Sequence, residues 1–580
     1  MPRLNEIPEI ILHHAEAGTW LRFHAPRTVL RTENPEEVLP ALREIEALVE
    51  KKGWHAAGFL SYEAAPAFDP AFRVVPSRDF PLLWFGLFPP PRVVAGPAGG
   101  SYSLFPWKPS ISRAAYNRAI ATIKREIARG ETYQVNYTLR LRSRFSGDPA
   151  GLFADIVRSQ VPGYSAMVDT GRFVICSASP ELFFRLEGER ITCRPMKGTV
   201  GRGRTPAEDE ERAAWLLASE KNRAENVMIV DMVRNDLGRI AENGTVRVPA
   251  LFTAERYPTL WQMTSTVTAR SAAPFSELMA ALFPCASITG APKVRTMGII
   301  ADLETTPRRV YTGSIGFLAP GRQAQFNVAI RGVIIDRKSK EAEYGVGGGV
   351  LWHSTARGEY EEALLKTSVL TFRRPEFSLL ETIRWTPEEG YFLLEKHAAR
   401  MAASARYFDI PATADGITAW LAESASTFPA HPQRVRLLMD HGGRLSLEHR
   451  PLTVEPEPPP LCVALAAEGV DSRDIFLFHK TTHRQVYESA LAARPGFDEV
   501  ILFNEEGQLT EFTVGNLVAD LDGRLVTPPV SCGLLPGTFR EDLLERGLVT
   551  ERIICRADLS RCTRLFMVNS VRRWQPAQLI

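Results

Sequence analysis

Two carboxylates and an amine near the middle of the chain have a spacing that could bind a metal ion or an anion. Glu359, Glu362 and Lys366 are three and four residues apart, so they share one face of a predicted helix. The glycine run Gly345–Gly349 precedes them and lets the backbone approach a ligand closely. Carboxylates without His or Cys nearby favour a hard ion such as Mg²⁺. The same spacing is also typical of an ordinary solvated Glu/Lys face.

A further acidic group, Glu225, lies in a helix predicted within residues 208–240. The run Val227–Val230, with Met232 and Val233, makes this segment apolar on nearly every side, so we expect the helix to be buried. A buried charge costs several kcal/mol unless it is paired or bound to metal. Glu225 therefore fits a metal ligand at least as well as a member of an internal salt-bridge network.

Two loops could contact anionic groups. Lys197 lies between a predicted strand and a glycine-rich loop. It could anchor a phosphate or carboxylate, act as a nucleophile if desolvation lowers its pKa, or be a solvated surface lysine. The segment from Ser287 is predicted to open a helix, where the amides of Thr289 and Gly290 could hold an anion.

The last third of the chain has a separate group of candidates. Lys480 ends a predicted apolar strand, Arg400 lies on an amphipathic helix, and Glu511 and Asn516 flank a turn between strands. Thr538 begins a predicted helix. Pyridoxal phosphate needs an amine, an acid for its ring nitrogen and an anion site for its phosphate. Each of these residues alone is usually structural, but together they predict a site for this cofactor.

Composition excludes several classes of protein. The chain has 580 residues, of which 45% are hydrophobic and 23% charged, which is typical of a globular protein. The near balance of 69 Lys+Arg against 67 Asp+Glu argues against a dedicated nucleic-acid or acidic-membrane binder. No apolar run approaches the roughly 20 residues of a membrane span. The 7 cysteines without a CxxC motif and the absence of a signal-peptide pattern predict reduced thiols in a cytoplasm.

Proline- and glycine-rich stretches suggest the domain boundaries. They begin at Pro81, at Arg373 and at Glu455. Short β-branched strands alternate with helical segments, which indicates an α+β or α/β architecture. We expect an N-terminal subregion over residues 1–105, a catalytic domain over 106–373 and a further α+β domain over 376–580.

Nine motifs between about residues 110 and 372 resemble one known family. In chain order they read GETYQVNYT, SPELF, MKGT, RAENVMIVDMVRNDLGRI, SITGAPK, YTGSIGF, FNVAIR, GVGGG and EYEEALLK. This order resembles the chorismate-utilising enzymes, which include anthranilate, aminodeoxychorismate, isochorismate and salicylate synthases. The resemblance implies a large α+β fold in which a β-sandwich core with surrounding helices encloses the site.

The resemblance also implies roles for individual residues. Mg²⁺ would bridge the ring carboxylate of chorismate to Glu225 and Glu362, with Glu359 close by. Glu181 would be the general acid for the departing C4 hydroxyl. The remaining substrate contacts would come from Arg331 and Lys366, which hold carboxylates, and from Thr289, Gly290, Gly347, Gly348 and Gln262.

Lys197 indicates which member of the family the chain resembles. Aminodeoxychorismate synthases have lysine in this K-G-T motif, where anthranilate synthases usually have alanine. A neutral lysine can add to ring carbon 2 as the C4 hydroxyl leaves, and ammonia then attacks carbon 4, so we expect a depressed pKa for Lys197. Gln262 stands where the family often has His, and Cys285-Ala286 replaces a usual Gly-Gly. None of the cysteines lies in a glutaminase-like elbow, which predicts a separate glutamine amidotransferase subunit or direct use of ammonia.

Residues 376 to 580 resemble the class IV aminotransferases, which have the fold-type IV of pyridoxal-phosphate enzymes and include aminodeoxychorismate lyase. The resemblance implies that Lys480 binds the cofactor covalently and Glu511 pairs with its ring nitrogen. Arg400 and Thr538 would bind the phosphate, with Asn516 nearby. The strand and D-x-G-x-x-Y-G-D segment that usually precede this region are absent. The pocket would then be shortened or completed by a partner subunit, as in a homodimer.

Together the two resemblances predict a cytoplasmic bifunctional enzyme that makes 4-aminobenzoate, a folate precursor, with Mg²⁺ and pyridoxal phosphate as cofactors. Three alternatives remain. The first part could be an anthranilate or salicylate synthase fused to an ordinary aminotransferase. The C-terminal region could be a docking module without activity. It could also transaminate amino acids.

Overall fold

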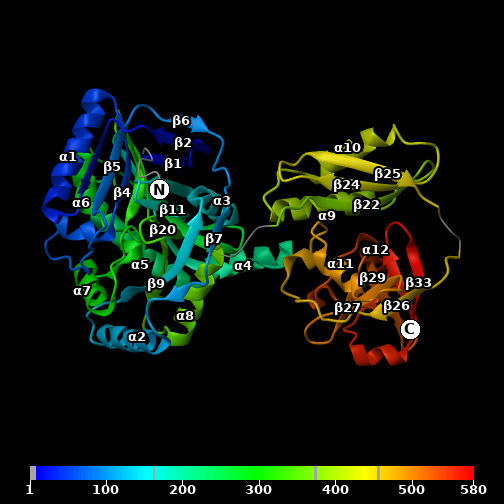
Figure 1. Cartoon of the computed structure of the whole chain (residues 1–580). Coiled ribbons are helices and arrows are strands. Elements are labelled where there is room, and N and C mark those ends of the chain that lie inside the picture. Colours follow the sequence, from blue (N-terminus) through cyan, green and yellow to red (C-terminus); the bar gives the residue numbers. More distant parts are fainter. Residues whose placement is uncertain (1–7, 161–162, 371–374, 454–456) are drawn as a thin grey trace. The chain divides into compact units, whose positions relative to one another are not determined.

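The computed structural model describes residues 8–160, 163–370, 375–453 and 457–580. The chain divides into two compact units (Figure 1). The first unit is Met1–Gly201 with Ala213–Arg374, and the second is Arg202–Arg212 with Pro375–Ile580. The breaks expected at Arg373 and Glu455 lie partly outside the described residues. All seven cysteines are free thiols, and among the described residues no helix is long and apolar enough to cross a bilayer.

The first unit is built on two large sheets whose described strand pairs are antiparallel. One sheet runs in the order β17 (Gly290–Ala291), β9 (Gln134–Gly147), β21 (Glu341–Val350), β20 (Gly332–Asp336), β11 (Phe173–Ser179), β10 (Tyr164–Asp169), β1 (Glu9–His14), β2 (Thr19–His24) and β6 (Arg92–Val94). The strands β7 (Tyr102–Leu104) and β8 (Lys108–Pro109) also pair with β9. The long β9–β21 pair brings the glycine run of β21 beside the start of β9.

The second sheet of this unit carries the K-G-T motif on its edge strand. Its order is β14 (Met196–Gly201), β16 (Leu260–Arg270), β13 (Arg190–Arg194), β12 (Leu182–Glu187), β19 (Gln323–Asn327), β18 (Ser314–Ala319), β4 (His55–Leu60), β5 (Leu83–Phe88) and β3 (Thr28–Thr32). The strand β15 (Arg247–Arg256) pairs with β16 as well. Apolar side chains of each sheet fill a buried cluster of its own, and a further cluster combines side chains of both sheets, such as Ile175 of β11 and Phe317 of β18.

Helices of the first unit cover these sheets with one apolar face each. Helix α1 (Pro35–Lys52) contacts β5 and α6 (Phe275–Leu282), and the Asn34 side chain caps its first turn (Figure 1). Its buried residues recur every three or four positions, as a helix packed on a sheet requires. They are Val38, Leu42, Ile45 and Val49.

The helix expected within 208–240 is two helices. Helix α4 (Pro206–Ala218) ends before Ser219, whose hydroxyl caps α5 (Glu220–Gly238). Only one face of α5 is buried, and Val227 is 37% exposed, so the prediction of a helix buried on every side is wrong. The reason is that an exposed ion pair, Asp231–Arg234, occupies the solvent face. Helix α5 packs against β14 and β16.

The second unit contains two sheets of its own. The smaller runs β23 (Gly390–Tyr391), β22 (Leu379–Thr386), β24 (Gln433–Met439) and β25 (Leu445–Pro451), with α9 (Leu394–Tyr407) and α10 (Ala414–Ala425) packed together. The larger runs β28 (Leu509–Phe512), β27 (Glu499–Phe503), β26 (Leu461–Leu465), β33 (Arg573–Leu579), β32 (Cys562–Asn569), β29 (Asn516–Leu521), β30 (Arg524–Thr527) and β31 (Thr550–Glu551). Helices α11 (Gln485–Ala492) and α12 (Thr538–Glu545) pack on β27 and β32.

Residues 202–212 belong to the second unit, although the sequence on both sides of them belongs to the first. The Tyr407 hydroxyl donates to the carbonyl of Gly203 at 2.7 Å. The Arg202 guanidinium lies 4.2 Å from the centre of the Tyr407 ring, and its Nε donates to Asp209 at 2.7 Å. Arg204 donates to the carbonyl of Ser472 at 3.3 Å. The segment is therefore an integral part of the packing of the second unit.

Candidate active sites

Lys197 lies on a β-bulge of the edge strand β14. Met196 pairs with Thr264 and Thr199 with Gln262, so three steps along β14 match two along β16. Gly198 takes a φ of 94°, which favours glycine. A bulge of this kind turns a side chain away from the regular alternation of a strand. The K-G-T sequence thus gives Lys197 a direction that a regular strand would not.

Neighbouring side chains hold the bulge in place. Gln262 Nε2 donates to the carbonyl of Gly198 at 2.8 Å, and the Thr199 hydroxyl donates to Gln262 Oε1 at 3.1 Å. Asn226 of α5 donates to the Lys197 carbonyl at 3.4 Å and accepts from the Ser265 hydroxyl at 2.6 Å. Both ends of the Gln262 amide are therefore engaged by β14. Its predicted contact with substrate stays a prediction.

The glycine run of β21 passes between Lys197 and helix α8 (Ala356–Leu365). A Cβ on Gly349 would lie 3.4 Å from Lys197 Nζ. A Cβ on Gly348 would lie 3.3 Å from Glu359 Oε2 and 3.5 Å from Lys366 Nζ. Because Gly348 and Gly349 have no side chains, space is left beside the Lys197 amine and the Glu359 carboxylate. Lys197, Glu359, Glu362 and Lys366, which were predicted as site residues, all lie near these two glycines.

Three carboxylates surround this position. The Ser354 hydroxyl donates to Glu359 at 2.6 Å. Burial raises the pKa of Glu359 and that of Glu225, and Glu362 adds to both shifts. Partial burial would also raise the pKa of Glu362, but the Lys366 ammonium 2.8 Å away holds it below its ordinary value.

This donor set fits a hard divalent cation. It consists of carboxylates without His or Cys, which is the chemistry that Mg²⁺ prefers. Two of the pKa values are raised by burial and by a like charge, which a bound cation would relieve. Within the described residues, no three acidic, His or Cys side chains are gathered closely enough to form a metal site. The assignment of Mg²⁺ to Glu225, Glu359 and Glu362 stays a prediction.

Glu181 is buried in the connection between β11 and β12. Burial raises its pKa to about 7, and the Ser287 hydroxyl, which donates to Oε1 at 2.6 Å, opposes that rise. The charges of Lys197 and Arg331 act in the same direction as Ser287. A carboxyl group with a pKa near neutrality can hold a proton and release it at ordinary pH.

Arg331 points toward the same region from the start of β20. Its backbone is left-handed, with a φ of 53°, and its carbonyl accepts from the amide of Ala178 at 3.1 Å. Its guanidinium donates to Gln160 Oε1. Burial lowers its pKa. The side chain is thus a partly desolvated cation next to Glu181, but its contact with a substrate carboxylate stays a prediction.

Thr289 and Gly290 do not lie at a helix N-terminus. Helix α7 (Lys293–Leu303) begins after Pro292, and the Thr289 amide donates to the carbonyl of Ala286 at 3.3 Å. Gly290 pairs with Val135 in β17. The interpretation of these amides as an anion site at a helix start is therefore wrong, because the Gly-Ala-Pro sequence forms a short strand before the helix. A direct contact of either residue with substrate stays a prediction.

The second unit contains a cavity of about 590 Å³. Residues from both of its sheets and from α9 and α12 line it. All of the cofactor residues expected from the sequence are among them: Lys480, Glu511, Arg400, Thr538 and Asn516.

Lys480 follows a 3₁₀ turn and not a strand. The turn covers Ile475–Leu477, and the Asp474 side chain caps it by accepting from Phe476 N at 2.9 Å. The expectation of a strand is wrong here, since a short apolar run does not distinguish the two. Burial, with Arg400 close by, lowers the pKa of Lys480 to about 8. A substantial fraction of this amine is therefore neutral near physiological pH.

Glu511 lies in β28 and lines the cavity. It accepts from the Tyr487 hydroxyl at 2.8 Å, from the Leu535 amide at 3.1 Å and from Asn516 Nδ2 at 3.3 Å. Burial raises its pKa to about 7, although these donors favour the ionised form. Asn516 also lies so close to Gly537 that a Cβ there would be 1.9 Å from Asn516 Oδ1. A side chain in place of Gly537 would therefore force Asn516 to shift.

Arg400 is held by Glu381 in a buried network. Arg400 Nε and Nη2 donate to the two Glu381 oxygens at 2.9 and 2.5 Å, and Nη1 donates to the carbonyl of Pro536 at 3.0 Å. His397 lies between Glu381 and Thr538, at 2.7 and 3.2 Å. Burial would raise the pKa of Glu381, but Arg400 and His397 lower it to about 2. Three of the five guanidinium N–H groups are used, so Arg400 keeps donors for an anion.

The cavity fits pyridoxal phosphate. It offers a partly neutral amine in Lys480, a buried acid in Glu511 and an anion site at Thr538, the first residue of α12. The cofactor would be held by these groups and by Arg400.

Sequence reasoning missed several residues of both sites. Gln134 lies in the GETYQVNYT motif and its Nε2 approaches Gly349, yet it was assigned no role. Tyr487 donates to Glu511, and Glu381 accepts from Arg400, but neither Tyr487 nor Glu381 was assigned a role from the sequence. Two groups lining the cavity, Arg434 and Arg572, gave no signal because they are far apart in the sequence.

Family comparisons agree with the two sites. The profile of the chorismate binding enzymes matches residues 93–372, and that of class IV aminotransferases matches residues 378–580. The first of these regions is therefore similar to the chorismate binding enzymes, and the second is similar to the class IV aminotransferases. This confirms the expected families and the expected α+β fold class of each part.

The first region is similar to several curated aminodeoxychorismate synthases. An aminodeoxychorismate synthase of Streptomyces griseus is 36% identical over 336 residues, which cover 57% of this chain and 43% of the relative. Aminodeoxychorismate synthase component 1 of Salmonella typhimurium is 37% identical over 264 residues, covering 45% and 58%. The chain thus spans about half the length of these curated relatives. The crystal structure of anthranilate synthase component I from Streptococcus pneumoniae shares the fold, with a TM-score of 0.51 and 23% identity over 63% of this chain and 90% of that one.

Proposed function

We propose that the chain converts chorismate and ammonia into 4-aminobenzoate in two reactions. The first unit would make 4-amino-4-deoxychorismate, and the second would eliminate pyruvate from it. The observation that carries the proposal is a lysine in each unit at the position where the chemistry needs an amine. Lys197 lies on a bulge beside three carboxylates, and Lys480 lines a cavity with Glu511.

In the first reaction, Glu181 would donate a proton to the C4 hydroxyl of chorismate, which leaves as water. Lys197 Nζ would add to carbon 2 as that bond breaks. Ammonia would then add to carbon 4 and expel the lysine, which returns to a free amine. Mg²⁺ held by Glu225 and Glu362 would neutralise the ring carboxylate. The burial that lowers the pKa of Lys197 supports its role as a nucleophile.

The ammonia would come from a separate glutamine amidotransferase. The cysteines of the chain do not lie in the glycine-rich elbow that a glutaminase nucleophile requires. One relative carries the name component 1, which fits a protein that works with a second component. All of the cysteines are free thiols, which fits a reducing compartment such as the cytoplasm.

In the second reaction, Lys480 Nζ would remove the proton from carbon 4 of the amino compound, so that pyruvate leaves and the ring becomes aromatic. Bound pyridoxal phosphate would supply the electron sink for this proton removal. Glu511 would hold the ring nitrogen of the cofactor, and Thr538 and Arg400 its phosphate. A second copy of the chain could complete the cavity where the usual front segment is absent.

Arginines at the cavity favour a substrate with more than one carboxylate. Arg434 and Arg436 project from the same face of β24, and Arg572 lines the same cavity. Burial lowers the pKa of Arg434, and the charges of Arg572 and Arg436 lower it further. Such mutual repulsion is relieved by an anion, and 4-amino-4-deoxychorismate carries two carboxylates. This supports the lyase over a transaminase for ordinary amino acids, and a lined cavity argues against a docking module without activity.

Product analysis tests the proposal. The purified chain would be incubated with chorismate, ammonia, Mg²⁺ and pyridoxal phosphate, and the products separated by chromatography. We expect 4-aminobenzoate and pyruvate in equal amounts. Ortho-aminobenzoate would refute the assignment of the first unit. Accumulation of 4-amino-4-deoxychorismate alone would refute that of the second, and transfer of amino groups between an amino acid and a keto acid would then identify a transaminase.

A further inference from the structure

Ser287 is the side chain that donates a hydrogen bond to Glu181. Its hydroxyl lies 2.6 Å from Glu181 Oε1, and both residues are buried. The donor comes from the 3₁₀ turn Ala286–Ile288, which is remote in sequence from Glu181. A hydrogen bond to one oxygen of a carboxyl group leaves the proton on the other oxygen, and so determines the direction in which that proton points.

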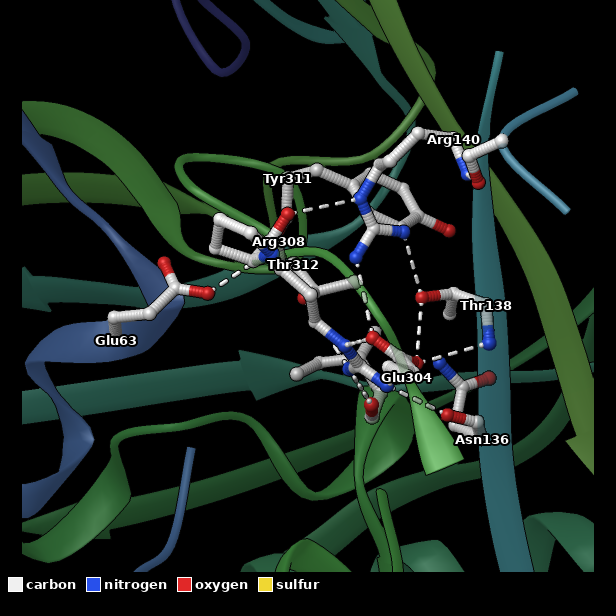
Figure 2. Close-up of polar contacts among 11 residues, drawn as sticks. Glu63, Asn136, Thr138, Arg140, Glu304, Arg308, Tyr311 and Thr312 are labelled. Atoms are coloured by element: carbon white, nitrogen blue, oxygen red, sulfur yellow. Dashed lines mark hydrogen bonds and ion pairs between the residues drawn. The ribbon is translucent and has the colours of Figure 1, made fainter. Parts of the chain in front are cut away.

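A buried arginine holds this turn in position. Arg308 Nη1 donates to the carbonyl of Ile288 at 3.0 Å, directly next to Ser287. Its Nη2 donates to the carbonyl of Asn136 at 2.7 Å, at the start of β9 (Figure 2). The amide of Asn136 in turn donates to the carbonyl of Thr289 at 2.8 Å. Arg308 therefore ties the turn that carries Ser287 to the strand beside the glycine run.

The charge of Arg308 is balanced by Glu304. The two Glu304 oxygens accept from Arg308 at 2.7 and 3.0 Å, and the second also accepts from Arg140 at 3.1 Å. The amide and hydroxyl of Thr138 donate to the first oxygen at 3.0 and 2.7 Å (Figure 2). Burial would raise the pKa of Glu304, but Arg308 and Arg140 hold it below its ordinary value. The pair is thus a fixed, fully ionised support.

We propose that Ser287 sets the proton affinity and direction of Glu181, and that Arg308 is the positioning residue that keeps Ser287 within reach. This inference rests on the proposed role of Glu181 as general acid. It goes beyond that role, since neither Ser287 nor Arg308 contacts the reacting atoms. Arg308 differs from an ordinary structural arginine in that its replacement should change the protonation equilibrium of Glu181.

Other charges face Glu181 as well. Lys197 of β14 and Arg331 before β20 favour its ionised form, and the Cys285 thiol lies near it from the same loop as Ser287. Ser287→Ala also removes a 3.3 Å contact between the Ser287 hydroxyl and the Cys285 thiol. Burial raises the pKa of that thiol to about 12, so a shift near pH 7 can be assigned to the loss of the hydrogen bond to Glu181.

The first variant is Ser287→Ala. Glu181 must be protonated to act as an acid, so the rate of chorismate consumption should fall as pH rises through its pKa. Loss of the donor destabilises the ionised form and raises that pKa. The falling limb of the pH profile should therefore move up by about one pH unit. The kcat below the limb should fall several-fold while KM changes little. An unchanged limb would overturn the proposal.

Arg308→Lys tests the positioning role. Lysine keeps the charge but cannot bridge two carbonyls and a carboxylate, so the limb should shift in the same direction by a smaller amount. In a Ser287→Ala background the second change should produce no further shift, because the two act through one bond. Equal shifts in both backgrounds would refute the positioning role. Thr312→Val, which removes a 3.3 Å contact of Arg308 Nη1, is a milder second variant should Arg308→Lys not fold.

The matched control is Arg337→Lys. Arg337 also forms a double hydrogen bond with a carboxylate, at 2.7 and 2.6 Å from Asp169, and donates to the carbonyl of Gly171 at 2.8 Å. These partners lie in the β10–β11 turn. The variant should leave the pH profile unchanged. A shift as large as that of Arg308→Lys would show a general effect of replacing an arginine that binds a carboxylate, and would overturn the proposal.

A spectroscopic titration separates this inference from the proposed function. Infrared spectra of the full chain without chorismate, compared with those of Glu181→Gln, report the protonated carboxyl group of Glu181 as pH is changed. The Ser287→Ala variant should raise the midpoint by about one pH unit. If the midpoint shifts but chorismate is not consumed, the proposed function fails and the role of Ser287 stands. If chorismate is consumed and the midpoint does not move, the role of Ser287 fails.

Discussion

Lys197 and Lys480 are both partly buried amines, but the charge with the largest effect differs. It is the carboxylate of Glu225 for Lys197 and the guanidinium of Arg400 for Lys480, which acts against the smaller opposing effects of Glu381 and Glu511. Glu225, Glu181 and Glu362 raise the pKa of Lys197 against the larger lowering by burial. Around Lys480, burial and Arg400 lower the pKa together, to about 8. Lys480 is therefore close to its reactive state in the free protein. Lys197 becomes more easily deprotonated when the carboxylates around it are neutralised, which a bound cation or a protonated Glu181 would do.

This difference suggests that the two units respond differently to their surroundings. In the second unit, burial and the fixed charges of the chain lower the pKa of Lys480 to about 8, so part of this amine is neutral in the free protein. In the first unit, burial lowers the pKa of Lys197 against the surrounding carboxylates, and a ligand that neutralises them would lower this pKa further. Four variants, taken from the largest expected effect to the smallest, test this comparison.

Lys480→Ala should abolish the second reaction and leave the first intact. We expect 4-aminobenzoate formation to fall by roughly 10⁴-fold, because the residue would be both the cofactor's attachment point and the base. Chorismate should still be consumed, and 4-amino-4-deoxychorismate should accumulate in the chromatogram. Normal release of 4-aminobenzoate would show that Lys480 is not the base.

Lys197→Ala should have the reciprocal effect. Formation of 4-amino-4-deoxychorismate from chorismate should fall by roughly 10³-fold, since the nucleophile at carbon 2 is lost. An anthranilate-type product could then form by addition of ammonia at carbon 2. The control is the same variant supplied with 4-amino-4-deoxychorismate, which should still yield 4-aminobenzoate. Unchanged synthesis from chorismate would refute the nucleophile.

Glu225→Gln should weaken the response of the first unit to Mg²⁺. Loss of one carboxylate should raise the Mg²⁺ concentration for half-maximal chorismate consumption by roughly 10²-fold. The acidic limb of the pH profile should move down, because a charge that raises the pKa of Lys197 is gone. Glu220→Gln, at the exposed start of the same helix, is the matched control. An unaltered Mg²⁺ response would exclude Glu225 as a ligand.

Tyr487→Phe should have the smallest effect and should be confined to the second unit. The phenol donates to Glu511, so its removal should raise the pKa of Glu511 above about 7. Because Glu511 must be ionised to hold a protonated ring nitrogen, the acidic limb of the lyase profile should move up by about one pH unit, with a loss of about tenfold below it. Tyr391→Phe, whose hydroxyl contacts the Leu421 carbonyl, is the control. Equal profiles for the two variants would contradict this account.

The sequence allowed candidate residues to be named, but it did not predict the local backbone structure that positions them. The order of motifs indicated Lys197, Glu181 and Glu511, because these residues lie in short segments of unusual composition. The bulge at Gly198 could not be predicted, since it depends on pairing with a strand about 60 residues further along the chain. The same limit applies to Ser287, whose partner is determined by a turn held from elsewhere.

Predictions from local sequence patterns were wrong where the same pattern is compatible with two kinds of secondary structure. The apolar run before Lys480 fitted a strand, but Asp474 caps it into a 3₁₀ turn. The helix within 208–240 seemed continuous in the sequence, but Ser219 ends one helix and caps the next. The arginines at the cavity come from β24 and from the C-terminal strand region, so only tertiary structure brings them together.

The position of residues 202–212 limits where the chain can be cut into two separate proteins. Because they pack with the second unit, the chain passes from one unit to the other after Gly201, after Arg212 and again after Arg374. A cut at residue 374 would thus leave the carbonyl of Gly203 without the Tyr407 hydroxyl, and the Arg202 guanidinium without the Tyr407 ring. A fragment that ends or begins at residue 374 would therefore lack part of the packing of the second unit.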